Sequence, residues 1–257
     1  GILGMGYPEE YGGTPGDVFF QIAVSEELMR STSGGFCAGL GSLHIALPPV
    51  LHLGTEEQKK KFIPPVLAGD KIAALGITES GGGSDVANIQ TTAERDGDYY
   101  IVNGSKCFIT SGCRADQLTC AVRTGEEGAH GISLLVIEAD TPGYSTSEKL
   151  KKSGWWASDT AEIFFNNCRV PAANLIGEEN QGFYGIMMNF QAERLSLAVM
   201  ANMTARMALE EAVEYARERK AFGKSLTGFQ VNRHKLADMA TLVEASTEFT
   251  YRVGAKI

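Results

Sequence analysis

The sequence predicts an α+β protein in three parts: a helical N-terminal domain over residues 1–72, a middle β domain over 73–176 and a helical bundle over 177–257. Apolar residues recur at helical intervals in the first and last parts. Between them lie short runs rich in β-branched and aromatic residues, separated by turn residues. With 257 residues, 44% of them hydrophobic, the chain is long enough for one large core or for two or three smaller ones.

Composition and charge exclude several classes of function. The net charge of -8 and the absence of a Lys/Arg cluster speak against a nucleic-acid partner. Five cysteines without CxxC spacing favour a reducing, intracellular compartment over secretion. No membrane span or signal peptide is expected, and the four histidines lack the spacing of a metal site. Because the chain begins at Gly1 and not at Met, we expect a processing or fragment boundary there.

Capping signals place the helices of the N-terminal part. Asp17 is a suitable N-cap for a helix over residues 17–30, and a second helical stretch covers residues 43–52. Thr55 followed by acidic residues and a glutamine predicts a capped helix that runs to Phe62. Pro64 and Pro65 are expected to end that helix.

The middle part predicts a β domain. The predicted strands, between residues 71 and 170, are AALGIT, DYYIV, SKCFIT, QLTCAV, GISLLVIEA and AEIFF. Asn103 and Gly104 separate two of these runs and predict a hairpin with a type I′ turn, in which both central residues need positive φ.

The helical period returns from about Gly182 to Arg219 and, after the FGKSLTGF turn, from about Phe229 to the end. Two long helices cannot cover each other's apolar stripes completely. We therefore expect the bundle to need further helices, with the chain incomplete at its C-terminus.

The glycine run in LGITESGGGSDV follows a predicted strand. Exposed N–H groups in such a loop can form an anion-binding nest, to which Ser84 adds a hydroxyl. The run is neither GxGxxG nor GxxxxGK[ST], so it predicts neither a Rossmann site nor a P-loop. A flexible surface loop is the alternative interpretation.

Six motifs occur in one order along the chain: ITESGGGSD, NGSKCFITSG, GWWASDTAEIFF, RVPAANLIGEENQGF, YARERKAFGKSL and FQVNRHKLADM. Together they resemble the acyl-CoA dehydrogenase family of flavoenzymes over nearly the whole chain. The resemblance implies the same three-part fold, FAD between the β domain and the C-terminal helices, an acyl-CoA substrate and electron-transferring flavoprotein as partner. It also implies a homotetramer that shares flavins across subunits, in the bacterial cytoplasm or the mitochondrial matrix.

The resemblance also implies which residues hold FAD, through backbone, hydroxyl, aromatic and guanidinium groups. They are Leu75, Ile77, Thr78, Gly83 and Ser84 in and before the glycine loop, Phe108 and Thr110 against the flavin ring, and Arg219, Phe222 and Gln230 toward a neighbouring subunit's FAD. Without it, KCFIT would be an ordinary hairpin strand and RERKAFGK a solvated helix end. Ser80 and Gly82 depart from the proline and alanine common in the family, so a more mobile loop is expected.

Glu193 lies on the otherwise apolar face of a predicted helix, which is costly for a carboxylate without compensation. An ion pair within the bundle would explain it. The resemblance favours another role: in isovaleryl-CoA and long-chain types a glutamate directly before an arginine on this helix is the catalytic base, as in NFQAERL. In most of the family the base lies in a segment that corresponds to positions beyond Ile257.

The resemblance further implies that Ser84, Gln191 and Arg194 bind the CoA substrate, although Arg194 could equally pair with an acid of the bundle. The predicted reaction is α,β-dehydrogenation of an acyl-CoA to trans-2-enoyl-CoA. Two other functions fit the same fold: a flavin oxidase or monooxygenase, and a truncated, non-catalytic paralogue that acts in assembly.

Overall fold

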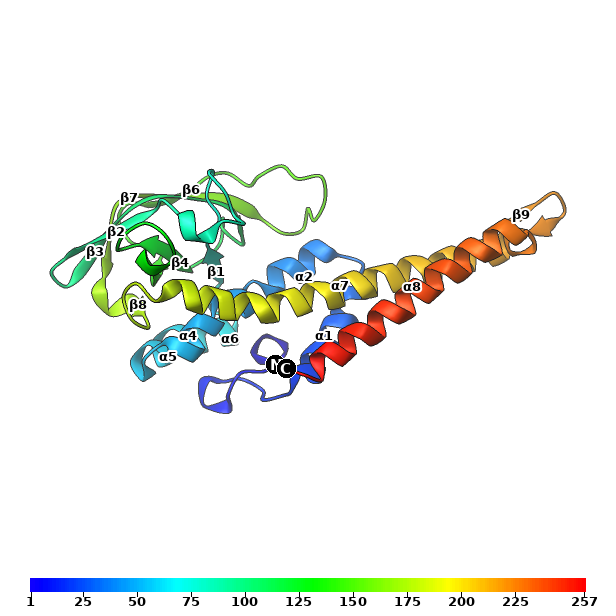
Figure 1. Ribbon diagram of the computed structural model, residues 1–257, viewed down its shortest axis with the longest axis horizontal. Helices are drawn as coiled ribbons and strands as arrows, with labels where there is room; N and C mark the ends of the chain where they lie inside the picture. The colour runs from blue at the N-terminus through cyan, green and yellow to red at the C-terminus, as the bar shows by residue number, and fades with distance from the viewer. The chain divides into compact units, whose positions relative to one another are not determined.

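The computed structural model describes residues 1–257 and has the predicted α+β class, with helices at both ends of the sequence and a β sheet between them (Figure 1). The chain divides into two compact units. The first comprises Gly1–Pro15 and Gly34–Gln191, and the second comprises Gly16–Ser33 and Ala192–Ile257. The three-domain division at residues 72 and 176 stays a prediction.

Short helices form the N-terminal layer of the first unit: α2 (Gly34–Gly41), α3 (Leu43–Ala46), α4 (Pro48–Leu53), α5 (Glu56–Phe62) and α6 (Pro64–Ala68). The predicted cap of α5 is confirmed as a capping box: Thr55 Oγ1 accepts from Gln58 N at 3.3 Å, and Gln58 Oε1 accepts from Thr55 N at 2.9 Å. The prediction that this helix ends before Pro64 and Pro65 is confirmed, because α5 ends at Phe62. Pro64 begins α6, because the first turn of a helix needs no N–H donor at that position.

The segment Gly34–Leu53 differs from the expectation that no stretch could span a membrane. An 18-residue window within its 20 residues has a mean hydropathy of 1.4, so by length and composition alone the segment would suffice to cross one. The segment is divided into α2, α3 and α4, and its Leu47 and Val50 are fully buried in the core of the first unit.

An eight-stranded sheet forms the centre of the first unit. Its order is β6-β7-β3-β2-β4-β5-β8, and β1 pairs with β4 in parallel. The strands are β1 (Ala73–Gly76), β2 (Thr92–Asp96), β3 (Tyr99–Thr110), β4 (Gln117–Arg123), β5 (Ile132–Glu138), β6 (Tyr144–Thr146), β7 (Thr160–Pro171) and β8 (Leu175–Ile176). The predicted runs correspond to β1, β3, β4, β5 and β7. The short or polar strands β2, β6 and β8 carry too little apolar pattern to be predicted.

The hairpin predicted at Asn103 and Gly104 is wrong. Strand β3 continues through both residues, and its pairing with β7 has a bulge between Val102 and Gly104. Gly104 has a φ of 137°, and a Cβ there would lie 2.8 Å from Thr91 Cα. The glycine therefore serves a bulge and a close backbone contact, two roles that share the sequence signal of a turn.

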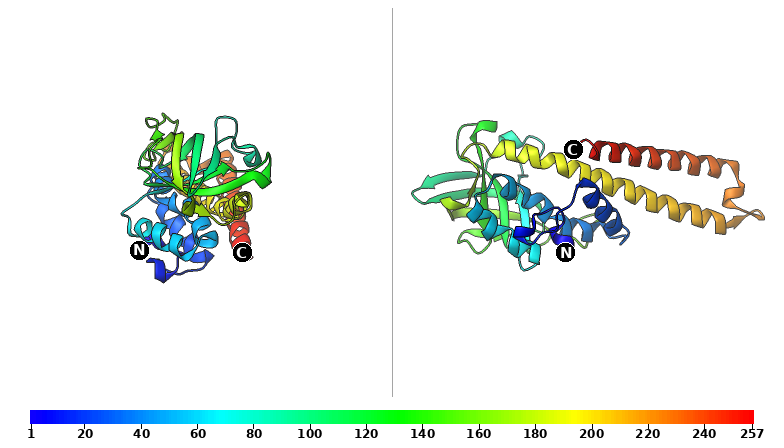
Figure 2. Two further views of the ribbon diagram at one scale, coloured as in Figure 1. Left: turned by 90° about the vertical axis from the view of Figure 1, so that its left-hand side faces the viewer. Right: turned by 90° about the horizontal axis from the view of Figure 1, so that it is seen from below.

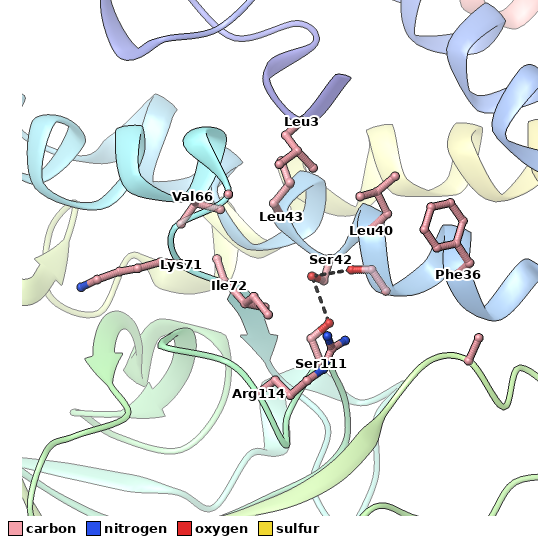
Figure 3. A pocket seen from close by; sticks show the side chains of 14 residues that line it. Leu3, Phe36, Leu40, Ser42, Leu43, Val66, Lys71, Ile72, Ser111 and Arg114 are labelled. Atoms are coloured by element: carbon pink, nitrogen blue, oxygen red, sulfur yellow. Dashed lines mark hydrogen bonds between the residues drawn. The ribbon is translucent and has the colours of Figure 1, made fainter. Parts of the chain in front are cut away.

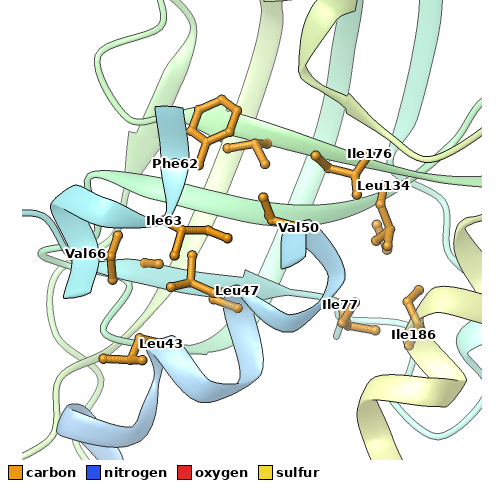
Figure 4. Packing of buried hydrophobic residues seen from close by; sticks show 14 of the residues in the cluster. Leu43, Leu47, Val50, Phe62, Ile63, Val66, Ile77, Leu134, Ile176 and Ile186 are labelled. Atoms are coloured by element: carbon orange, nitrogen blue, oxygen red, sulfur yellow. The ribbon is translucent and has the colours of Figure 1, made fainter. Parts of the chain in front are cut away.

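Buried apolar side chains cover both faces of the sheet. Along β5, Leu134 and Val136 belong to the cluster that includes the helical layer, whereas Leu135 and Ile137 belong to the cluster on the other face. Figure 4 shows Leu134 within the first cluster, which also holds residues of α3 to α6. Apolar side chains therefore follow one another along β5, as expected for a strand of a sheet that is buried on both faces.

The second unit contains α1 (Val18–Met29), most of α7 (Gly182–Glu218) and α8 (Gln230–Gly254), which confirms the predicted helices. Helices α7 and α8 lie side by side and are joined by a hairpin of β9 (Lys220–Ala221) and β10 (Lys224–Ser225) (Figure 2). Asn202 Nδ2 donates to Thr250 Oγ1 at 2.8 Å between the two helices. Asp17 caps α1 through Phe20 N, as predicted.

Replacing Leu134 with Ala should lower the free energy of unfolding by about 2–5 kcal/mol, because the side chain is fully buried and the change leaves a cavity. Urea unfolding measures this loss. Ile2→Ala is a matched control at a half-exposed position and should cost about 0.5 kcal/mol or less. Equal losses in the two variants would contradict the described core.

Candidate functional site

The glycine loop leaves the sheet directly after β1. Its three glycines, Gly81 to Gly83, are exposed, and Gly82 is held by reciprocal N–H···O bonds of 3.1 Å with Glu79. Gly82 has a φ of 157°, whereas at Gly83 the constraint is space: a Cβ would lie 3.0 Å from Thr78 Oγ1. The N–H groups of Gly81 and Gly83 donate to no other backbone group. The loop therefore presents free amide donors beside a threonine hydroxyl.

A bulge in β3 presents the second part of the site. The pairing of β3 with β7 shifts register between Lys106 and Ile109, and Phe108 lies in the bulge with a φ of 59°. This left-handed conformation is uncommon for a non-glycine residue and costs free energy. It leaves the phenyl ring 68% exposed. Thr110 ends the strand two residues later.

One backbone bond joins the loop to the bulge: Cys107 N donates to Thr78 O at 2.8 Å. The fold thus brings together the predicted residues of the loop and those of KCFIT. Leu75 lies in β1, and Ile77 is buried in the core, so Ile77 offers only its backbone here.

Lys106 and Glu79 lie behind these segments, and neither was among the predicted site residues. The Lys106 side chain is 0% exposed, and its Nζ donates to Glu79 Oε1 at 2.8 Å and to Ile77 O at 3.2 Å. Glu79 also accepts from Thr91 N at 2.9 Å and from Gln90 N at 2.6 Å. The detectable signal in the sequence was a lysine inside the predicted strand SKCFIT, where a buried ammonium has to find an acceptor.

The environment of Glu79 favours its charged form. Burial by itself raises the pKa of a carboxyl, but the Lys106 ammonium and the hydrogen bonds outweigh it and hold the pKa of Glu79 below its ordinary value. Glu79 is therefore a structural carboxylate at neutral pH.

Glu193 differs from Glu79 in each of these respects. It is half-buried in α7, and its Oε2 is buried without a hydrogen-bond partner. Burial raises the pKa of Glu193, and the nearby Arg194 guanidinium lowers it less. Gln191 and Arg194 lie on the same helix and are exposed. A carboxylate with an unused oxygen and a raised pKa is suited to accept a proton.

The remaining predicted cofactor residues lie at the connection between α7 and α8. Phe222 is 97% exposed with a φ of 49°, and its ring lies edge-on to Phe229 at 6.4 Å. Arg219 directly follows α7, and Gln230 begins α8. The predicted cofactor residues thus form two groups, one in each unit.

Two hollows lie elsewhere. A cavity of about 300 Å³ in the first unit is lined by residues of α2 and α3 and by Ser111, whose Oγ donates to Ser42 Oγ at 3.2 Å (Figure 3). A groove of about 550 Å³ in the second unit lies along α7 and α8. Neither is lined by a predicted site residue, because the glycine loop and Phe108 lie on the open surface.

Comparison with family models decides the family. Models described as the N-terminal, middle and C-terminal domains of acyl-CoA dehydrogenase match residues 1–70, 74–168 and 180–257. The chain belongs to the acyl-CoA dehydrogenase family.

Relatives and solved structures agree with this family. An acyl-CoA dehydrogenase of Bacillus subtilis is 40% identical over 98% of the chain, and the pig mitochondrial long-chain specific enzyme is 42% identical over 97%. The chain spans 66% and 58% of the lengths of these two curated relatives. The crystal structure of the enzyme from Geobacillus kaustophilus is 44% identical with a TM-score of 0.92, and the match covers 96% of this chain and 66% of that one.

The lowered pKa of Glu79 predicts a pH dependence of stability. The unfolded chain binds this proton near pH ~4.3, whereas the folded chain binds it only at lower pH. The contribution of Glu79 is thus complete above about pH 4.3 and is lost as the pH falls through the folded-state pKa. In urea unfolding between about pH 3 and 6, the free energy of unfolding of Glu79→Gln should fall less steeply with falling pH than that of the wild type. If the free energies of unfolding of the two proteins fall equally with pH, Glu79 does not have the lowered pKa assigned to it.

Proposed function

We propose that the whole protein catalyses the FAD-dependent α,β-dehydrogenation of an acyl-CoA thioester to a trans-2-enoyl-CoA. Membership of the family and the two-part loop and bulge site support this proposal. A solved acyl-CoA dehydrogenase from Bacillus anthracis complexed with FAD is 34% identical to this chain, with a TM-score of 0.94.

The donor set of the first unit fits FAD. The unused amide groups of Gly81 and Gly83 and the Ser84 hydroxyl suit a pyrophosphate, which an oriented set of N–H groups can bind. The exposed Phe108 ring suits the face of a flat heterocycle, and the Thr78 and Thr110 hydroxyls suit its polar edge. In this proposal Leu75 and Ile77 contribute backbone groups, and Arg219, Phe222 and Gln230 serve the FAD of a neighbouring subunit.

Glu193 is the base in this proposal, and the observation that carries it is the buried Oε2 without a hydrogen-bond partner. The carboxylate takes the α-proton of the thioester, and the electron pair of that C–H bond becomes part of the new C=C bond. FAD, when bound, accepts the β-hydrogen with its electron pair as hydride. A residue corresponding to a position beyond Ile257 is the alternative base, and the experiment below separates the two.

Three of the predicted site residues would contact the substrate. Ser84, Gln191 and Arg194 would hold the CoA part, because amide, hydroxyl and guanidinium groups bind phosphate and amide oxygens. The relatives include a long-chain enzyme from pig, a short-chain enzyme from Megasphaera elsdenii and an isovaleryl-CoA enzyme from Pongo abelii.

Electron-transferring flavoprotein is the proposed electron acceptor. A solved structure named for the electron-transferring flavoprotein of Acidaminococcus fermentans contains a chain 39% identical to this one, with a TM-score of 0.95. A homotetramer in the bacterial cytoplasm or the mitochondrial matrix completes the proposal, in keeping with bacterial and mitochondrial relatives.

A flavin oxidase is the second candidate. The prolyl acyl carrier protein oxidase AnaB is 33% identical to this chain with a TM-score of 0.95, so this fold also carries oxidase chemistry. Reoxidation by air of the substrate-reduced protein separates the two functions. A dehydrogenase reoxidises slowly in air and quickly with electron-transferring flavoprotein, whereas an oxidase needs only oxygen.

Glu193→Gln should leave folding and FAD content intact but slow flavin reduction by about 10²–10⁴-fold, because the amide cannot accept the α-proton. Anaerobic stopped-flow reduction of the whole protein by an acyl-CoA measures the rate. In the wild type the rate should fall as the pH drops through the raised pKa of Glu193, since only the ionised form is a base. A near-normal rate in the variant would assign the base to another residue.

Gly83→Val should weaken FAD binding about tenfold or more, which corresponds to about 1.4 kcal/mol. A Cβ at this position would press on Thr78 Oγ1 at 3.0 Å, and a branched side chain would also displace the loop. Titration of the flavin-free protein with FAD gives the dissociation constant. Gly154→Val is the control, because nothing lies within 4 Å of a Cβ there. Equal affinities in the two variants would refute the proposed role of the loop.

A further inference from the structure

We propose that Lys106 and Glu79 are positioning residues that fix the glycine loop and the Phe108 bulge in one arrangement for FAD. This inference rests on the proposed function. Neither side chain faces the open surface, so both act through the segments that they hold.

The Lys106 ammonium binds two acceptors that flank Thr78. Its Nζ contacts the carbonyl of Ile77 and the carboxylate of Glu79, the residues on either side of Thr78. Lys106 itself directly precedes Cys107, whose N–H binds Thr78 O at 2.8 Å. Thr78 is thus held at its own carbonyl and at both neighbours by two consecutive residues of β3.

The Glu79 carboxylate extends this connection to the far side of the loop. Its two oxygens accept the N–H groups of Gln90 and Thr91, which lead into β2. The Glu79 backbone closes a reciprocal pair of bonds with Gly82. Glu79 therefore fixes the glycine turn through its backbone, and through its carboxylate it fixes the segment that leads back into β2.

Positioning is needed because both binding segments are conformationally unfavourable by themselves. Three successive glycines lose much conformational entropy on ordering, and Phe108 has a left-handed backbone. If a site is already ordered before its ligand binds, less of the binding free energy is lost in ordering it. Loss of the Lys106–Glu79 pair should therefore weaken FAD binding by more than the accompanying loss of stability explains.

The test compares single and double variants of the whole protein. Lys106→Met and Glu79→Gln each leave one buried group uncompensated, so both single variants should lose stability. The double variant Lys106→Met with Glu79→Gln removes both charges and keeps one of the two side-chain oxygens that accept from Gln90 N and Thr91 N. Its melting temperature should therefore recover toward the wild-type value.

FAD affinity then separates positioning from general stability. The dissociation constant, from titration of the flavin-free proteins, should stay at least tenfold weaker in the double variant although its melting temperature recovers. Arg114→Met removes one partner of the Arg114–Asp159 ion pair, outside the loop and the bulge, and should leave the affinity within about twofold of wild type.

Wild-type affinity in a folded double variant would overturn the inference, and so would an equal loss in Arg114→Met. If the double variant does not fold, Glu79→Gln alone provides the test: affinity loss beyond that of Arg114→Met supports positioning, and equal affinity refutes it. A wild-type protein that binds no FAD would instead refute the proposed function.

Discussion

The Lys106 ammonium is buried beneath the candidate site, and the arrangement of that site depends on the acceptors that compensate it. An isolated buried charge would be very costly, so the Ile77 carbonyl and the Glu79 carboxylate have to stay within hydrogen-bond distance. Because these acceptors flank Thr78, the requirement of one side chain fixes the glycine loop against β3. The exposed groups of the loop and of Phe108 are thus supported by a buried charge pair, in which the Lys106 side chain is 0% and the Glu79 side chain 8% exposed.

Two carboxylates of the chain show how environment assigns chemistry. Glu79 receives an ammonium and two backbone donors, which lower its pKa and keep it charged. Glu193 is half-buried with one oxygen unpartnered, and burial raises its pKa. Opposite shifts of this kind are what the proposed division between a structural anion at Glu79 and a base at Glu193 requires.

Local signals in the sequence predicted local structure well. The Asp17 and Thr55 caps and the helical periods of α7 and α8 depend on neighbours within a few residues, and all are present. The prediction of a hairpin at Asn103 and Gly104 was wrong because a bulge and a tight turn both use a glycine with positive φ. Lys106 and Glu79 were missed because they are 27 residues apart, and only the folded sheet brings them together. The motif resemblance named the loop and bulge residues but not the pair beneath them.

Amide hydrogen exchange on the flavin-free protein tests most directly whether the site is ordered before FAD binds. If the buried pair orders the site, Cys107, Gln90 and Thr91, whose N–H groups bind Thr78 O or Glu79, should exchange slowly, at rates typical of sheet amides. Gly81 and Gly83 should exchange rapidly and become protected only when FAD is added. Exchange at Cys107, Gln90 and Thr91 as fast as at the glycines would mean that the ligand, and not the buried pair, orders the loop and the bulge.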